Sequence, residues 1–255
     1  MEDGEVCKMD VLFFAGQSNM EGQTESLPAD CSPVEDTLEY HFLTDSFVPL
    51  CHPAGEDVPP MLSGANDGHG SLLPDFCRAY RGFRPVQVAA VHTARGATTI
   101  DDWVPGGTLY LAAAAKQQAA LRAVGKEAEH IYFVWLQGES DAVRGLSEDA
   151  YLKKLIDFKN ALKRDCLIEK FGIIRVGYFT GGTQDEAIMS AQERAAREDT
   201  DFLMLTAVTA RLSKEERYLN PEAAGHYNNA AMAVIGREAG AALGRYAAAA
   251  DKSGS

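Results

Sequence analysis

The 255-residue sequence has few basic residues and no long apolar run. Its 24 lysines and arginines stand against 37 acidic residues, which gives a formal net charge of -13. Such a charge repels nucleic acid and anionic membrane surfaces, so neither is expected as a partner. The N-terminus lacks the basic start and apolar run of a secretory signal, and no stretch is long enough to span a bilayer. We therefore expect a cytoplasmic protein.

Cysteine pairs are also missing. The five cysteines are odd in number, are scattered along the chain and form no Cys-x-x-Cys motif. A disulfide framework or a zinc site needs paired cysteines at short spacing, so neither is expected and the thiols are predicted to be free.

What the sequence does contain is an alternation of short apolar runs and helical patterns. Five runs predict buried strands, at residues 10–15, 86–91, 131–136, 173–178 and 202–205. Apolar spacings of three and four residues predict helices at 109–124, 149–163, 186–197 and 223–246. Such alternation indicates a mostly parallel five-stranded sheet covered by helices on both faces, which is a three-layer α/β/α sandwich of the α/β class.

The length suits one large domain, which we place at residues 10–246. Residues 1–9 are predicted to form an N-terminal arm and residues 247–255 a solvated C-terminal tail. The stretch from Thr24 to about Gly70 is rich in turn residues and has little periodicity. Because so long an irregular segment in a compact domain usually serves function, substrate contacts are expected there.

Ser18 follows the first predicted strand directly, within the segment FFAGQSNM. Ligands of open α/β sheets bind outside the carboxyl ends of the strands, so Ser18 is a candidate nucleophile. Capping of the next helix is the alternative role for this serine. No G-x-S-x-G motif is present, which counts against an α/β-hydrolase elbow.

A second polar group, WLQGESD, follows the strand at residues 131–136. Gln137 is a candidate donor to an oxyanion, and Glu139 is a candidate to orient a histidine. A turn at Gly138 followed by a helix cap is the alternative interpretation.

Two further candidates lie near loops. Gly96, after the second strand, allows a main-chain N–H to approach a ligand closely. His226, in the segment GHYNNA at the start of the last helical pattern, is a candidate base, although an isolated histidine near a helix end is more often structural. In a parallel sheet these segments converge on one edge, as acyl transfer requires.

Together these segments resemble the SGNH hydrolases, and among them the carbohydrate acetylesterases that include sialate O-acetylesterase and acetylxylan esterase domains. GQSNM resembles the nucleophile block, RGATTIDDW the glycine block and WLQGESD the W-H-Q-G-E-S-D block. The resemblance implies a flavodoxin-like sandwich without metal or organic cofactor. It also implies that Ser18 is the nucleophile, that His226 is the base, and that the oxyanion donors are the N–H groups of Ser18 and Gly96 with the Gln137 side chain.

The sequence departs from the family pattern at three positions. The acid expected three residues before the histidine is replaced by Ala223, and Glu222 is one residue away. Three alternatives remain for the orientation of His226, namely Glu222, Glu139 or no acid at all. An orienting acid fixes the imidazole tautomer, and we favour Glu139 for this role. Leu136 and Ala97 replace a histidine and a glycine, and both are expected to alter only the pocket walls.

The resemblance therefore predicts a serine esterase that removes O-acetyl groups from a sugar or oligosaccharide through an acetyl-serine intermediate. Arg95, beside the oxyanion glycine, is a candidate to contact a sugar carboxylate, with a surface salt bridge as the alternative. Other possibilities are a non-catalytic glycan-binding protein and a hydrolase of non-sugar esters. The sequence does not indicate which sugar is bound or how many subunits assemble.

Overall fold

The computed structural model describes residues 8–61 and 69–254, so the predicted N-terminal arm lies largely outside the described residues. Seven strands form one sheet in the order β3-β2-β4-β1-β5-β6-β7. All neighbours in the sheet are parallel except β2 and β3, which form an antiparallel hairpin at one edge. The strands are β1 (Met9–Gly16), β2 (Thr37–His41), β3 (Ser46–Pro49), β4 (Gln87–Ala94), β5 (Ala128–Leu136), β6 (Lys170–Ile174) and β7 (Phe202–Thr206).

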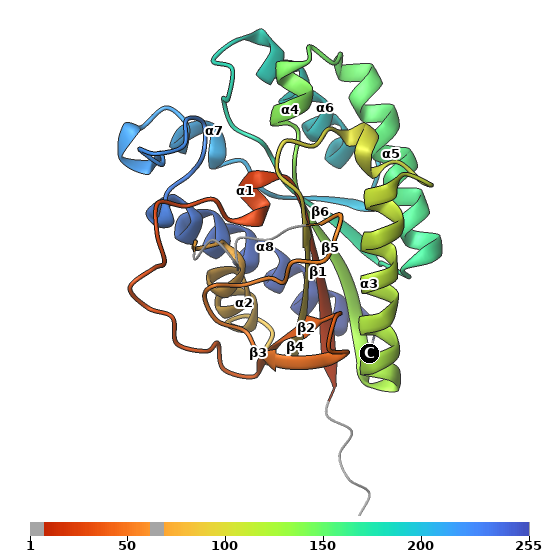
Figure 1. The fold of residues 1–255 in the computed structure, drawn as a ribbon. Helices are drawn as coiled ribbons and strands as arrows, with labels where there is room; N and C mark the ends of the chain where they lie inside the picture. Colours follow the sequence, from red (N-terminus) through yellow and green to blue (C-terminus); the bar gives the residue numbers. More distant parts are fainter. Residues whose placement is uncertain (1–7, 62–68, 255) are drawn as a thin grey trace, which may run out of the picture.

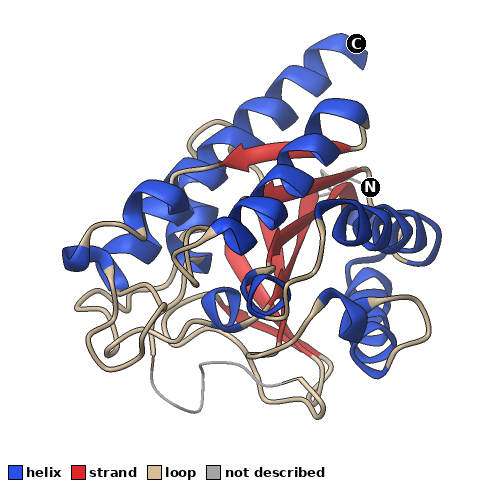
Figure 2. Ribbon diagram, turned by 90° about the horizontal axis from the view of Figure 1, so that it is seen from above, coloured by secondary structure: helices blue, strands red, loops and turns tan. Residues whose placement is uncertain are grey.

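Helices cover both faces of this sheet (Figures 1 and 2). One layer holds α3 (Thr108–Val124), α5 (Glu148–Asp165) and α6 (Thr183–Glu198), and the other holds α2 (Leu73–Arg81) and α8 (Asn229–Gly254). The short elements are α1 (Ser18–Glu21), η1 (Ile100–Trp103), η2 (Gly125–Glu127), α4 (Glu139–Val143), α7 (Thr209–Leu212) and η3 (Glu216–Tyr218). The predicted three-layer α/β/α class is confirmed. In the described ranges, no helix is both long and apolar enough to cross a membrane.

The sheet has seven strands, whereas the sequence predicted five. The hairpin of β2 and β3 lies inside the stretch from Thr24 to Gly70, which we expected to be irregular. The buried residues of β2 include the charged Glu39 next to Tyr40. The segment therefore lacks the continuous apolar run by which the other strands were recognised in the sequence. Residues 62–68 of the same stretch lie outside the described residues.

Helix α8 begins later and ends later than predicted. It starts at Asn229 instead of residue 223, because the side chain of Asn228 accepts a hydrogen bond from the N–H of Ala231 and so caps the helix there. The helix then continues to Gly254, through the segment that was expected to be a tail. Ala247 in this segment is fully buried, and Asp251 pairs with Arg84 and His130.

Aromatic side chains fill the core between the sheet and α5. Phe158 of α5 packs edge-on against Trp135 of β5, with ring centroids 5.1 Å apart, and against Phe133 at 5.6 Å. Trp103 from η1 packs on Trp135 at 5.4 Å. Burial of such large rings supplies much of the hydrophobic free energy of folding. Parallel pairing of Gly16 with Leu136 places the carboxyl end of β5 next to that of β1, where the candidate site begins.

Candidate active site

Ser18 is the first residue of α1, two residues after the end of β1. The turn between strand and helix is held by the N–H of Gln17, which donates to the carbonyl oxygen of Leu136 at the end of β5 over 3.1 Å. Only 5% of the Ser18 surface is exposed. The serine therefore stands at the carboxyl end of the central strand on a fixed turn, as predicted for a ligand-facing position.

His226 lies in a loop between η3 and α8, three residues before the helix begins. The loop is closed by main-chain bonds from the N–H of His226 to Ala223 at 3.1 Å and from Asn220 to the His226 carbonyl at 2.8 Å. Gly225 has a φ of +77°, and a Cβ there would lie 2.2 Å from the Phe179 ring. A glycine at this position thus permits both the turn and the edge-to-face packing of Phe179 on His226, with centroids 6.1 Å apart.

The structure brings Ser18 and His226 together. The Nε2 atom of His226 lies 2.8 Å from the Oγ atom of Ser18, although the residues are 208 positions apart. The other ring nitrogen, Nδ1, lies 3.1 Å from the carbonyl oxygen of Ala224. With Nδ1 protonated, the ring donates to this carbonyl and presents a basic Nε2 lone pair to the serine hydroxyl. This geometry suits proton abstraction from Ser18.

Glu139 does not reach the imidazole. This carboxylate, the first residue of α4, is buried, and its Oε1 atom accepts from Nδ2 of Asn19 over 2.8 Å. The Oδ1 atom of Asn19 accepts in turn from the N–H of Tyr227 over 3.2 Å. Glu139 thus supports the histidine loop through Asn19. Burial raises the pKa of Glu139. Glu222 makes no hydrogen bond to the ring either within the described residues, and its N–H donates to the Asn220 side chain.

Gln137 also lies differently from the prediction. Its side chain is fully buried, and its Nε2 atom donates to Asp141 at 2.6 Å and to the Thr98 carbonyl at 2.9 Å. Its Oε1 atom accepts from the hydroxyl of Tyr151 at 3.1 Å. In this arrangement the amide ties the loop after β4 to the loop after β5, and it does not line the cavity that contains Ser18.

The loop after β4 places Gly96 beside the nucleophile. A Cβ on Gly96 would lie 3.4 Å from the Ser18 Cβ and 2.8 Å from a carboxylate oxygen of Glu21, so the main chain comes close to the serine. Arg95 points elsewhere, since its guanidinium donates to the Pro60 carbonyl at 3.3 Å. Ala97 has a φ of +59°, a conformation that suits the glycine of related sequences better than alanine.

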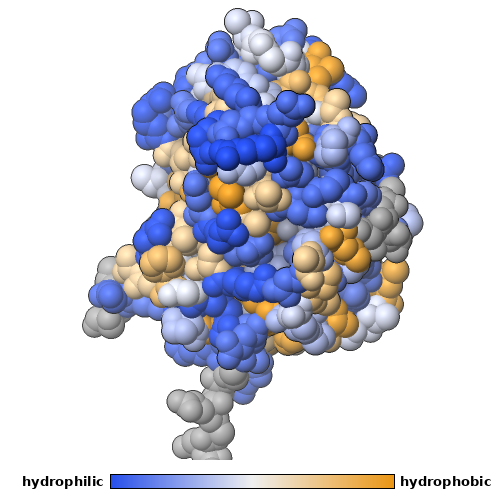
Figure 3. Space-filling model, turned by 90° about the vertical axis from the view of Figure 1, so that its left-hand side faces the viewer, coloured by the Kyte–Doolittle hydropathy of each residue, from blue (hydrophilic) through white to orange (hydrophobic). Residues whose placement is uncertain are grey.

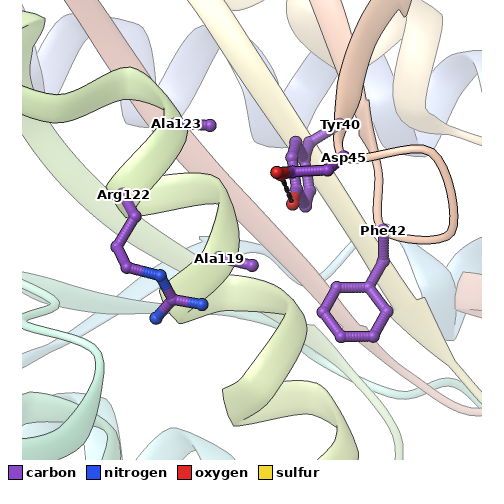
Figure 4. Close-up of a pocket in the computed structure, with 6 residues that line it drawn as sticks. All are labelled: Tyr40, Phe42, Asp45, Ala119, Arg122 and Ala123. Carbon is purple, nitrogen blue, oxygen red and sulfur yellow. Dashed lines mark hydrogen bonds between the residues drawn. The ribbon is translucent and has the colours of Figure 1, made fainter.

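A cavity of about 360 Å³ opens over Ser18 and His226. Its wall combines apolar and polar side chains from five segments, namely Gln17, Gln23, Ala97, Ser140, Val143, Arg144 and Phe179. A cavity of similar volume lies between the β2–β3 hairpin and α3, where Arg122 stands opposite the hydrogen-bonded pair Tyr40 and Asp45 (Figure 4). That second cavity is lined by no serine or histidine among the described residues, whereas Ser18 and His226 both line the first.

Sequence reasoning missed several residues of this site. Asn19 was not recognised as the residue that links Glu139 to the histidine loop, although it follows Ser18 in the GQSNM segment. The Ala224 carbonyl could not be foreseen, because any residue carries a carbonyl and only the loop conformation selects this one. Phe179 and Arg144 stand in segments to which no motif drew attention.

The parallel sandwich, with a serine and a histidine at the carboxyl edge of its strands, defines an SGNH-type hydrolase fold. Within that class, residues 8–243 match the family model for "Carbohydrate esterase, sialic acid-specific acetylesterase". The chain therefore belongs to this carbohydrate esterase family, as the sequence resemblance predicted. No curated protein sequence matches the chain.

Solved structures share the fold at low sequence identity. A protein from Arabidopsis thaliana is 18% identical, with a TM-score of 0.68 over 92% of this chain and 97% of that one. A carbohydrate acetylesterase from Xanthomonas citri is 16% identical, with a TM-score of 0.54 over 92% of this chain and 55% of that one. A putative GDSL-like lipase from Parabacteroides merdae is 12% identical, with a TM-score of 0.54 over 94% and 98%.

Proposed function

We propose that this protein hydrolyses O-acetyl groups on a carbohydrate through an acetyl-serine intermediate. The observation that carries the proposal is the 2.8 Å hydrogen bond between Ser18 Oγ and His226 Nε2 in an open cavity. Ser18 attacks the acetyl carbonyl while His226 takes its proton, and the imidazolium then protonates the departing sugar alcohol. Water, activated by the same histidine, releases acetate and regenerates the serine.

The oxyanion of each tetrahedral intermediate needs hydrogen-bond donors in place before reaction. The main-chain N–H groups of Ser18 and Gly96 are the donors we assign, because neither has an acceptor among the described residues and Gly96 lies against Ser18. The Gln137 amide already donates to Asp141 and Thr98, so we assign it the role of holding the Gly96 loop in place. A role as third donor would require these bonds to rearrange.

An acetylated sugar is the substrate class favoured by the family to which the chain belongs. The likeness to the Xanthomonas citri acetylesterase agrees with this choice. The face of the molecule seen in Figure 3 is mostly hydrophilic, and its apolar residues lie in small separate patches. That face, over its described residues, gives no broad apolar surface for a lipid aggregate.

The test compares wild type with Ser18→Ala and His226→Ala on O-acetylated sialic acid and acetylated xylo-oligosaccharides, with acetate release as the readout. We expect release from at least one sugar in the wild type and its loss in both variants. A fluorophosphonate probe should label wild type and not Ser18→Ala. Labelling of Ser18 without acetate release from either sugar would indicate a different acyl ester, and absence of both would indicate a non-catalytic glycan-binding protein.

A further inference from the structure

Among the described residues that line the active-site cavity, two can carry a charge. One is His226, which serves the serine, and the other is Arg144, which follows the last residue of α4. The remaining lining residues are neutral, and they are Gln17, Ser18, Gln23, Ala97, Ser140, Val143 and Phe179. A cation at the rim of an otherwise neutral cavity is a feature of the site that acetyl transfer itself does not need.

Arg144 is also unusual among the arginines of this acid-rich chain. Most of them pair with a carboxylate, as Arg84 does with Asp10 at 2.6 Å and Arg194 does with Asp149 at 2.7 Å. Arg144 has no ion pair or side-chain hydrogen bond within the described parts of the chain. The nearby acids Glu148 and Asp149 both face Arg194 instead. The guanidinium is therefore left available to a group that enters the cavity.

The main chain holds Arg144 firmly while its side chain stays exposed. Its N–H closes the last turn of α4 by donating to the Ser140 carbonyl at 3.1 Å, and the next residue, Gly145, donates to Ala142 at 2.9 Å. Ser140, one turn before, lines the same cavity as Ser18. A sugar whose acetyl group reaches Ser18 therefore leaves the rest of its ring within the span of a long side chain at the rim.

We propose that Arg144 determines specificity by binding a carboxylate on the same sugar that carries the acetyl group. A guanidinium forms two parallel N–H···O bonds to a carboxylate, and such bonds favour acidic over neutral sugars. The inference rests on the proposed esterase function and assigns its charge recognition to one residue. Arg95, the earlier candidate for this role, bonds to Pro60 and does not line the cavity.

Carboxylates near the site oppose this preference, so the arginine is needed to overcome them. A Glu21 oxygen lies 2.8 Å from where a Cβ of Gly96 would stand, and Glu139 is buried behind Asn19. Neither of these carboxylates lines the cavity, whereas Arg144 does. Together with the net charge of -13, they make an acidic sugar a poor ligand for this cavity once the arginine is removed.

The experiment first measures binding without turnover. Ser18→Ala is titrated in a calorimeter with an O-acetylated sugar acid, either sialic or glucuronic, and with its methyl ester, which has the same skeleton without the charge. We expect the acid to bind about three- to thirtyfold more tightly than the ester, which is the range for a charge-assisted pair that is partly open to water. Adding Arg144→Gln should remove this preference, and Arg144→Lys should retain part of it.

Arg122→Gln is the matched control, because Arg122 also lines a cavity without a carboxylate pair but belongs to α3, far from Ser18 in the sequence and in a different cavity. It should leave the preference unchanged. Equal acid-to-ester ratios with and without Arg144 would overturn the inference. Turnover of p-nitrophenyl acetate, a small neutral ester, reports separately on the esterase. Arg122→Gln, in the other cavity, should leave that rate within about twofold. A wild type inactive on every ester would overturn the proposed function and leave the binding result to decide the role of Arg144.

Discussion

The Nδ1 atom of His226 lies 3.1 Å from the main-chain carbonyl oxygen of Ala224, in the place where a catalytic triad holds a carboxylate. A carbonyl fixes the tautomer and the orientation of the ring, as a carboxylate does, but it carries no full charge to stabilise the imidazolium. The site is thus arranged as a Ser18–His226 pair with main-chain support. The position that holds an acid in related sequences is Ala223, one residue before this carbonyl.

The arrangement predicts a mild effect for Glu139→Gln. Because Glu139 acts on the histidine loop only through Asn19, an isosteric amide that still accepts from Asn19 should lower kcat by less than about tenfold. Loss of a true triad carboxylate lowers kcat by about ten-thousandfold. Steady-state kinetics on p-nitrophenyl acetate separates these values, and a loss near the larger one would restore Glu139 as the orienting acid.

The same substitution has a predicted effect on stability. Burial raises the pKa of Glu139 in the folded state above its unfolded value. The contribution of this one group to stability is therefore greatest at low pH and is lost as pH rises through the folded pKa. Glutamine removes this titration. The difference in melting temperature between Glu139→Gln and wild type should therefore grow in favour of the variant from pH 4 to pH 8, as calorimetric scans at several pH values can measure.

Gln137→Ala distinguishes support from oxyanion binding. If the amide holds the loops after β4 and β5 together, its removal takes a donor from the buried Asp141 carboxylate and from the Thr98 carbonyl, and costs about 1–3 kcal/mol of folding free energy. A direct oxyanion donor would instead lower kcat about a hundred- to a thousandfold without lowering the melting temperature. We expect the melting temperature to fall, and an unchanged one with a large loss of kcat would return Gln137 to the oxyanion role.

The sequence contained enough to predict the layers and the place of Ser18 near a strand end, because both depend on local patterns. Ser18 lies two residues after a fully buried strand, and strand ends in a parallel sheet lie at one edge. The start of α8 was misjudged because Ala223 and Ala224 favour helix, while the Gly225 turn and the Asn228 cap favour a loop. Those two residues were the available signal for a loop around His226.

Side-chain partners were harder to predict, since they depend on where distant loops meet. Glu139 and His226 both lie in the site region, and only the fold places Asn19 between Glu139 and the histidine loop. The sequence likewise does not reveal that Arg144 lacks an ion pair among the described residues, because only the fold shows that Glu148 and Asp149 pair with Arg194. Local sequence patterns thus predicted which segments meet at the site better than they predicted which side chains pair there.

The burial of His92 predicts that the folded protein loses stability in mild acid. This histidine of β4 is buried and its Nε2 atom lies 3.0 Å from the Met20 carbonyl, and burial lowers its pKa to about 4. Because the folded pKa is below the unfolded value, the stabilisation is complete above pH 6.5 and is lost as pH falls toward 4, by roughly 3 kcal/mol. His92→Gln should flatten this part of the stability curve in urea titrations, and a slope equal to that of wild type would show that other groups govern it.

The last two turns of α8 predict a loss of stability when the chain is shortened. Ala247 is fully buried, and Asp251 binds Arg84 and lies 3.0 Å from Nε2 of His130. Removing residues 247–255 should lower the melting temperature by about 5 °C, the effect of roughly 2 kcal/mol in a domain of this size. Removing only residues 252–255 keeps both contacts and should leave the melting temperature unchanged.

The cost of the longer truncation should also depend on pH. Hydrogen bonds to Glu169 and Asp251 raise the pKa of His130 to about 9. A raised folded pKa means that the stabilisation is complete below the unfolded value near 6.5 and is lost as pH rises through 9. The difference between wild type and the truncated chain should thus be larger at pH 6 than at pH 10. Equal differences at both pH values would show that burial of Ala247, and not the Asp251–His130 pair, anchors the helix.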